Sequence, residues 1–181
     1  MAYLARAERR AAIINAALTI MRNSGFTAVT ARSVAEECGG SPGLIHQHFS
    51  SVDELVAEAW NTYVAENIQE FTTATEKTDT HPLNEFYANH LDANAQQELG
   101  LWADAWAHAL RTPKFAHVFA NTIDELTTAL READPTMSAA EADRTIFIAM
   151  GLAGMHKIAP DTYPHARVAA VAHLDATAPQ K

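Results

Sequence analysis

The 181-residue sequence has little cysteine and no long apolar run, and each shortage excludes a class of protein. Its one cysteine, Cys38, cannot form an internal disulfide, and we expect it to pack in a core rather than act as a redox switch. The longest strongly apolar stretch, residues 145–155, is shorter than the roughly 18–20 residues that a membrane-spanning helix needs. The N-terminal residues carry charges where a signal peptide needs an apolar core. These features predict a cytoplasmic protein that does not enter a membrane.

Positive charge is also scarce, which by itself argues against a nucleic-acid partner. Thirteen lysines and arginines face 22 aspartates and glutamates, so the net charge is −9. The charge is unevenly placed, because residues 1–50 hold five arginines against three glutamates, whereas residues 51–181 hold eight basic and nineteen acidic residues. Any phosphate contact should therefore come from the first fifty residues, with the acidic remainder facing away from it.

No segment keeps the two-residue alternation of a strand, and apolar residues instead recur at helical spacing along the chain. The sequence therefore predicts an all-α fold. Two of the expected helices begin with a capping box, formed by Ser51 with Glu54 and by Ser138 with Glu141. The expected helices span about 4–23, 30–38, 41–49, 53–75, 82–99, 101–111, 113–133, 139–158 and 163–175.

The most informative region is residues 25–55. It predicts two short helices separated by Gly39-Gly40, which is the helix-turn-helix arrangement whose second helix can enter a DNA major groove. At about 100° per residue, Ile45 and Phe49 share the face that packs on the preceding helices. Gly43 and Gln47 then point outward, and the face between them can approach and hydrogen-bond a base or a phosphate. From geometry alone, an ordinary helical hairpin of a bundle remains an alternative.

A set of matching positions in this region carries a family resemblance: Gly25-Phe26, Val29-Thr30, Val34-Ala35, Gly39, Ser41-Pro42-Gly43, Ile45, His48-Phe49 and Glu54-Leu55. The stretch resembles the DNA-binding signature of the TetR family of transcriptional regulators. This resemblance implies a helix-turn-helix DNA-binding domain in residues 1–50 and a helical ligand-binding and dimerisation domain in residues 51–181. It also implies a ligand-responsive regulator, with no cofactor, that represses as a homodimer on a palindromic double-stranded DNA operator.

The resemblance implies phosphate contacts at Thr30 and Ser41 and groove contacts along the second helix. The expected DNA-binding residues are Thr30, Arg32, Ser41, Pro42, Gly43, Leu44, His46, Gln47 and His48. Two positions depart from the family pattern, because most members have tyrosine in place of His46 and lysine in place of Val52. Losing that lysine removes one expected phosphate contact, whereas a histidine can itself donate to phosphate.

The C-terminal part resembles the family more loosely. The run 101–110, followed by Pro113 and Phe115, is similar to the regulatory half of the betaine-repressor-type branch, and so is the later pair Gly151-Leu152. The segment 139–158 is apolar nearly all round and must be covered on both sides. We expect one side to meet the core and the other a second subunit, so that the last two helices form an intersubunit bundle. A helix buried centrally within one subunit is the alternative.

A small-molecule effector is expected in the C-terminal domain, where aromatic residues recur at helical spacing and could hold a cation through their ring faces. Packing of the same residues in an ordinary core is the alternative. The expected ligand-binding residues are Trp60, Tyr63, Asn67, Phe86, Tyr87, His90, Trp102, Trp106 and Met150.

Enzyme and metal chemistry find no support in the sequence. No two of the nine histidines stand three or four residues apart, the spacing that places two metal ligands on one helix face. There is no glycine-rich phosphate loop and no nucleophile elbow, and the carboxylates are scattered. We therefore expect neither an enzyme nor a metal protein. A helical small-molecule sensor that no longer binds DNA remains a second function class.

Overall fold

The computed structural model describes residues 6–77, 80–91 and 96–176, and these residues form nine α-helices and one short 3-10 helix. No strand occurs among them, so the predicted all-α fold is confirmed. The elements are α1 (Arg6–Ser24), η1 (Phe26–Ala28), α2 (Ala31–Glu37), α3 (Pro42–His48), α4 (Val52–Lys77), α5 (Pro82–Leu91), α6 (Gln96–Ala109), α7 (Pro113–Ala133), α8 (Ala139–Ile158) and α9 (His165–Ala176).

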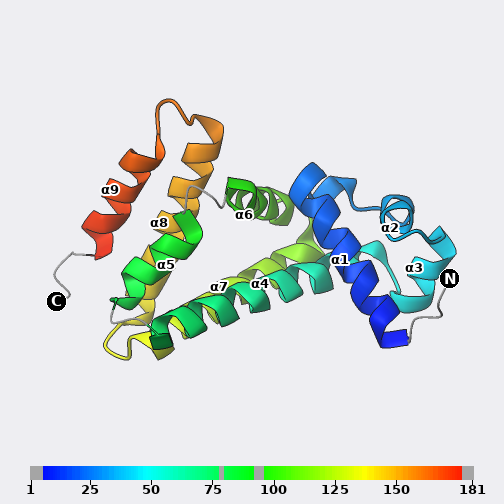
Figure 1. The fold of residues 1–181 in the computed structure, drawn as a ribbon, viewed down its shortest axis with the longest axis horizontal. Coiled ribbons are helices and arrows are strands. Elements are labelled where there is room, and N and C mark those ends of the chain that lie inside the picture. The colour runs from blue at the N-terminus through cyan, green and yellow to red at the C-terminus, as the bar shows by residue number, and fades with distance from the viewer. Residues whose placement is uncertain (1–5, 78–79, 92–95, 177–181) are drawn as a thin grey trace.

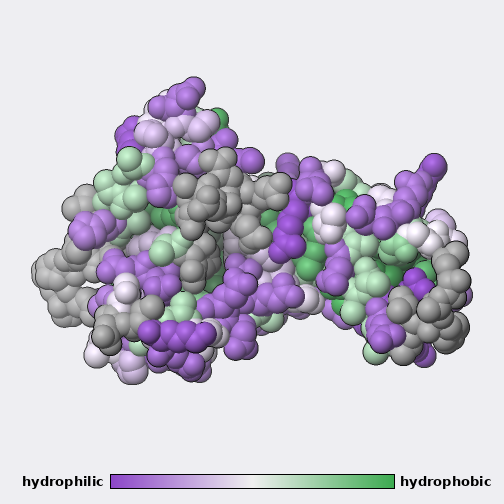
Figure 2. Space-filling model, viewed as in Figure 1, coloured by the Kyte–Doolittle hydropathy of each residue, from purple (hydrophilic) through white to green (hydrophobic). Residues whose placement is uncertain are grey.

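The helices gather into two ends joined by a narrower middle (Figure 1). Helices α1, α2 and α3 lie at one end, and α5, α8 and α9 lie at the other. The long helices α4 and α7 pack side by side and run between the ends, while α6 lies over the middle and contacts α1, α7 and α8. Most of the face seen in Figure 2 is hydrophilic, and hydrophobic residues show beside α1 near the middle. One connected set of buried side chains runs through both ends.

Local chemistry explains several helix starts. Helix α8 begins at a reciprocal capping box, in which Ser138 and Glu141 each accept a hydrogen bond from the other residue's backbone N–H, as predicted. At the start of α4 only half of the predicted box forms. The Glu54 N–H donates to the Ser51 hydroxyl at 3.1 Å, but the Glu54 carboxylate accepts from the N–H of Ser50 at 2.7 Å instead of that of Ser51.

One predicted helix boundary is wrong. The sequence pattern placed a break between residues 99 and 101, whereas α5 ends at Leu91 and α6 begins at Gln96, so Gly100 lies inside α6. A Cβ at Gly100 would stand 3.2 Å from the Cε of Lys157 in α8. This glycine therefore serves the close approach of two helices, and its usual meaning as a helix terminator misled the prediction.

Two further expectations have outcomes in the fold. Cys38 is half-buried and packs against the core, as expected. Within the described residues, no helix combines the length and the apolar character that a membrane crossing requires.

Candidate functional site

Helix α3 is oriented by two buried apolar side chains. Ile45 is 0% exposed, and Phe49, at the C-terminal cap, is 2% exposed. The Phe49 N–H donates to the Ile45 carbonyl at 2.9 Å, which completes the last turn before the chain turns into the core. Because both side chains are buried, the opposite side of α3 faces outward, as the helical spacing predicts.

The nine predicted DNA-binding residues lie at the surface or at its edge, and their contact with DNA remains a prediction. Leu44 and His48 are half-buried, and the Leu44 side chain lies against Gly40 in the turn. A Cβ at Gly43 would meet only the Ser41 hydroxyl, at 3.9 Å, so another molecule can approach the backbone closely there. The other seven residues are exposed: Thr30, Arg32, Ser41, Pro42, Gly43, His46 and Gln47.

The caps of α2 and α3 use their serine and threonine residues differently. Thr30 and Ser33 form a capping box, with each hydroxyl accepting from the other residue's N–H at 2.9–3.0 Å. The sequence did not reveal this box because serine stands where glutamate or glutamine is usual. Ser41, at the N-cap of α3, makes no capping hydrogen bond through its side chain. Its exposed hydroxyl is therefore not engaged by its own helix.

Arg32 is oriented by its own helix. Its Nε donates to Oε1 of Glu36, one turn later, at 2.9 Å, and this hydrogen bond, together with the charge of Glu36, raises the pKa of Arg32. Both side chains are largely exposed, 84% and 67%, so the ion pair is weak in water. The expected phosphate contact of Arg32 is compatible with this weak pairing and stays a prediction.

Arg10 is a positioning residue that the sequence analysis counted only as a basic charge. Its guanidinium donates to both carboxylate oxygens of Glu58 in α4 and to the backbone carbonyl of His48 at the end of α3. The guanidinium carbon also lies 4.1 Å from the centre of the Phe49 ring. Arg10 in α1 thus fixes the end of α3 against α4. Only the tertiary structure shows this, because its partners lie 38 and 48 residues away.

Comparison with known proteins agrees with this geometry. The family described as "Bacterial regulatory proteins, tetR family" matches residues 13–59, which contain η1, α2, α3 and the turns around them. In these residues the chain is similar to the TetR family. The HTH-type transcriptional regulator BetI of Brucella anthropi is 29% identical over 105 residues, which cover 56% of this chain and 54% of that relative. The chain thus matches about half the length of this relative, and about a third of the other curated relatives.

Solved structures share the fold over nearly the whole chain. A transcriptional regulator from Rhodococcus sp. Rha1 superposes with a TM-score of 0.78 at 21% identity, covering 92% of this chain and 93% of the other. A putative transcriptional regulator from Saccharomonospora viridis, in complex with choline, gives a TM-score of 0.76 at 18% identity, covering 93% and 95%. The expected TetR resemblance and its helical C-terminal domain are confirmed. TetR regulators are not enzymes, in agreement with the expectation from the motifs.

One contact between the helix-turn-helix region and the rest of the chain lies at Phe26. The Phe26 N–H donates to the Asp104 carboxylate of α6 at 2.8 Å. Gly25 has a φ of +83°, and a Cβ there would stand 2.8 Å from the same carboxylate oxygen, so glycine is required by both conformation and space. The Phe26 ring stacks on His108 at 5.2 Å and meets Phe115 edge-on at 5.1 Å. Helix α6 is thus linked directly to the segment between α1 and α2.

The environment of His108 affects its proton. Burial lowers the pKa of His108, and the charge of nearby Asp104 acts in the opposite direction. The neutral ring is therefore favoured where it stacks on Phe26.

Several of the predicted ligand-binding residues form an aromatic cluster, defined here as Trp60, Tyr63 and Trp102. Trp60 and Trp102 meet edge-on at 4.9 Å, and Tyr63 lies 5.4 Å from Trp60 and 6.1 Å from Trp102. Trp60 and Tyr63 are 0% exposed, and the indole N–H of Trp60 donates to the Thr122 hydroxyl at 2.8 Å. Much of the cluster is therefore packed core with its polar group satisfied.

Three predicted ligand residues line one small cavity beside this cluster. Phe86, Trp102 and Met150 surround it together with aliphatic residues of α7 and α8, and its volume is about 20 Å³, room for a single water molecule. We call this space the α8 cavity. None of the residues that line it is charged.

The remaining predicted ligand residues lie elsewhere. Trp106 is 41% exposed although Trp102 is 6% exposed, so the two do not share a buried face as expected; a four-residue spacing rotates by about 40°, which suffices to reach the edge of the helix. Asn67 donates its amide to the Tyr63 carbonyl at 2.8 Å. Tyr87 lines a different groove, between α5 and α9. The His90 side chain lies outside the described part of the chain.

Proposed function

We propose that the chain is a DNA-binding transcriptional repressor that acts as a homodimer in the cytoplasm. Each subunit inserts α3 into the major groove of one half of a palindromic operator, with half-sites about one helical turn apart. The observation that carries this proposal is the outward face of α3, where Gly43, His46 and Gln47 are exposed opposite the buried Ile45 and Phe49. That face is polar and carries no acidic side chain. Arg10 fixes the end of α3 against α4.

The residues around α3 support roles in both positioning and readout. Thr30, Ser41 and Arg32 surround the helix with hydroxyl and guanidinium groups that can bind phosphates, which set register without reading sequence. Gln47 can pair with adenine through its amide, and His46 can donate to a base or a phosphate. We infer that residues 1–50 form the DNA-binding domain and residues 51–181 the ligand-binding and dimerisation domain.

The experiment that tests DNA binding is a gel shift with the DNA upstream of the chain's own gene, followed by footprinting. A specific, palindromic footprint is expected, with an affinity that falls as salt rises, because bound phosphates release counterions. A protein that has become a sensor without DNA binding would protect no site in this DNA or in a selected random library, and that result would overturn the proposal.

The dimer is supported by an apolar surface on the last two helices. Phe147, Met155 and Ile158 of α8 are 51%, 37% and 77% exposed, and Val171 of α9 is 41% exposed. The other side of α8 is buried in its own subunit, so the exposed side favours a second subunit over a helix covered centrally by its own chain. A Cβ at Gly151 would meet nothing within 4 Å, so a second backbone can approach closely. A second copy of this surface is the partner that we propose.

The dimer is tested by placing a charge on this surface. Phe147→Asp should convert the protein from dimer to monomer in analytical ultracentrifugation, because an aspartate would be buried without a partner. Leu110→Asp is the matched control, since Leu110 is 79% exposed but lies in the turn that follows α6, away from α8 and α9 in the sequence. If both variants stay dimeric, or both become monomeric, the interface lies elsewhere.

We propose that the effector is a small organic cation that enters and widens the α8 cavity. The rings of Phe86 and Trp102 line this space, no basic group repels a cation there, and the similar Saccharomonospora viridis regulator was crystallised with choline. Widening the cavity would displace α6 and, through Asp104 and Phe26, the helix-turn-helix. DNA affinity would then fall by the effector's preference for the displaced state.

Choline provides the probe for this effector class. Adding it to the protein–DNA complex should release DNA, and Met150→Trp, which fills the α8 cavity, should abolish release while DNA binding persists. Release that is equally effective in the variant would place the effector elsewhere.

A further inference from the structure

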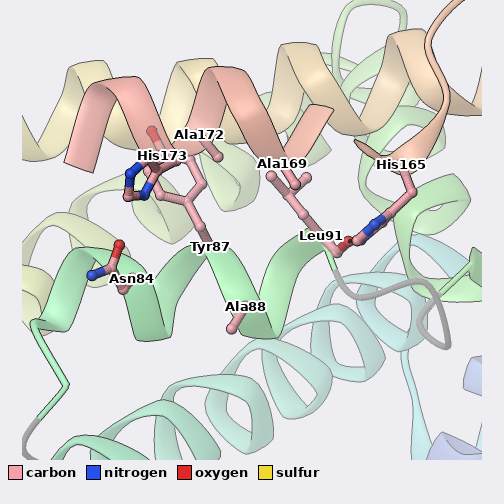
Figure 3. Close-up of a pocket in the computed structure, with 8 residues that line it drawn as sticks. All are labelled: Asn84, Tyr87, Ala88, Leu91, His165, Ala169, Ala172 and His173. Carbon is pink, nitrogen blue, oxygen red and sulfur yellow. Dashed lines mark hydrogen bonds between the residues drawn. The ribbon is translucent and has the colours of Figure 1, made fainter. Parts of the chain in front are cut away.

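A groove of about 320 Å³ lies between α5 and α9 (Figure 3). One stripe of α5 lines it, at the helical spacing i, i+3, i+4 and i+7: Asn84, Tyr87, Ala88 and Leu91. One stripe of α9 faces it: His165, Ala169, Ala172 and His173. Three of these eight residues are alanines, Ala88, Ala169 and Ala172, whose small side chains leave space between the two helices.

The groove is distinct from the proposed effector cavity. Phe86 belongs to the α8 cavity, whereas its neighbour Tyr87, which is 5% exposed, forms the floor of the groove. The groove is also about sixteen times larger, and its volume lies in the range of small-molecule sites, roughly 300–1,000 Å³.

Polar groups stand at the two ends of the groove and apolar groups between them. Figure 3 shows Asn84 and His173 toward one end and His165 toward the other. The two histidines on α9 are eight positions apart, which corresponds to about 12 Å along the helix. Ala88, Ala169 and other apolar side chains line the middle, and none of the described residues that line the groove carries a carboxylate.

The hydrogen bond of His165 determines which ligand group can bind at its end of the groove. Its Nε2 lies 2.6 Å from the Leu91 carbonyl oxygen. Because a carbonyl only accepts, Nε2 carries the proton, and in the neutral ring Nδ1 is then an acceptor. A ligand hydroxyl suits this end, whereas the Asn84 amide and the His173 imidazole at the other end can donate to an acid group.

We propose that this groove binds an elongated organic acid, with a carboxylate at the Asn84–His173 end, a flat apolar body over Tyr87, and a hydroxyl toward His165. The distance between the polar ends limits the body to about one aromatic ring with a short side chain. This site is additional to the effector cavity, and its binding does not depend on DNA binding by the chain.

The probe is 4-hydroxycinnamate, titrated into the full chain by calorimetry. It should bind with one molecule per subunit, and 4-hydroxycinnamyl alcohol, which keeps the ring hydroxyl but lacks the carboxylate, should bind at least tenfold more weakly. Ala88→Leu should weaken 4-hydroxycinnamate binding at least tenfold by filling the groove. Ala120→Leu, which also replaces an exposed helical alanine, is the matched control and should leave binding unchanged.

Two more variants separate this site from the effector site. His173→Ala should weaken binding of 4-hydroxycinnamate five- to tenfold and leave binding of 4-hydroxycinnamyl alcohol unaffected, while Met150→Trp should leave binding of the acid unchanged. Absence of binding at millimolar probe, or binding that Ala88→Leu leaves intact, would overturn the proposal. The assay contains no DNA, so its failure is distinguishable from failure of the proposed repressor function.

Discussion

The outward face of α3 and the aromatic cluster of Trp60, Tyr63 and Trp102 differ in how their side chains are used. On α3, His46 and Gln47 are exposed and make the surface, while buried neighbours only orient them. In the cluster the conspicuous residues are themselves the buried packing. In this chain an aromatic pattern therefore predicts burial well and a ligand site poorly. A polar face opposite two buried residues, by contrast, indicates an available surface.

The largest effect is expected for a substitution in the aromatic cluster, and it is an effect on the stability of the fold. Trp60→Ala should lower the free energy of unfolding by about 3–5 kcal/mol, because it leaves a cavity in a packed core and removes the partner of Thr122. Urea denaturation measures this. Trp106→Ala, at a half-exposed position on α6, is the control and should cost less than about 1 kcal/mol. Equal costs would mean that the cluster is loosely packed.

The reverse result is expected on α3. Gln47→Ala should weaken operator binding by about 5- to 150-fold, the equivalent of one lost base contact of 1–3 kcal/mol. Stability should change by less than about 0.5 kcal/mol, because the side chain is exposed. Fluorescence anisotropy with operator and with unrelated DNA measures both affinity and selectivity. If neither changes, α3 is oriented differently on DNA.

An intermediate effect is expected where α6 contacts the segment between α1 and α2. Asp104→Ala should destabilise the protein by about 1–2 kcal/mol, because the Phe26 N–H loses a charged acceptor. It should also reduce the response of DNA binding to the effector. Asp104→Asn keeps an acceptor oxygen and should recover most of the stability. Loss of stability with an unchanged response would show that Asp104 is structural and does not transmit the signal.

The smallest expected effect is the contribution of His108 to the pH dependence of stability. Because burial lowers the pKa of His108 in the folded protein, the unfolded chain binds a proton more readily there. Stability is therefore unaffected by His108 above its ordinary pKa of 6.5 and falls as pH decreases below it. Thermal unfolding of wild type and His108→Gln between pH 7.5 and about 5 should show a flatter decline for the variant. A steeper decline in the variant would contradict this sign.

Much of the fold could be predicted because its signals are local. The boundaries 113–133 and 139–158 coincide with α7 and α8, since Pro113 and the Ser138 cap mark the starts within a few residues. The failure at Gly100 has the opposite cause: Lys157, more than fifty residues away, explains the glycine. Arg10 shows the same limit at the candidate site, because a guanidinium with three partners cannot be distinguished in sequence from a solvated charge.

The sequence by itself determined the helices and the outward polar face of α3, because caps, turns and helical periodicity act over a few residues. Only the tertiary structure decided which aromatics became core, how Asp104 of α6 joins the turn at Gly25, and where α5 and α9 leave space between them. Those outcomes depend on the packing of segments distant in sequence, where a side chain of one helix sets the space available to another.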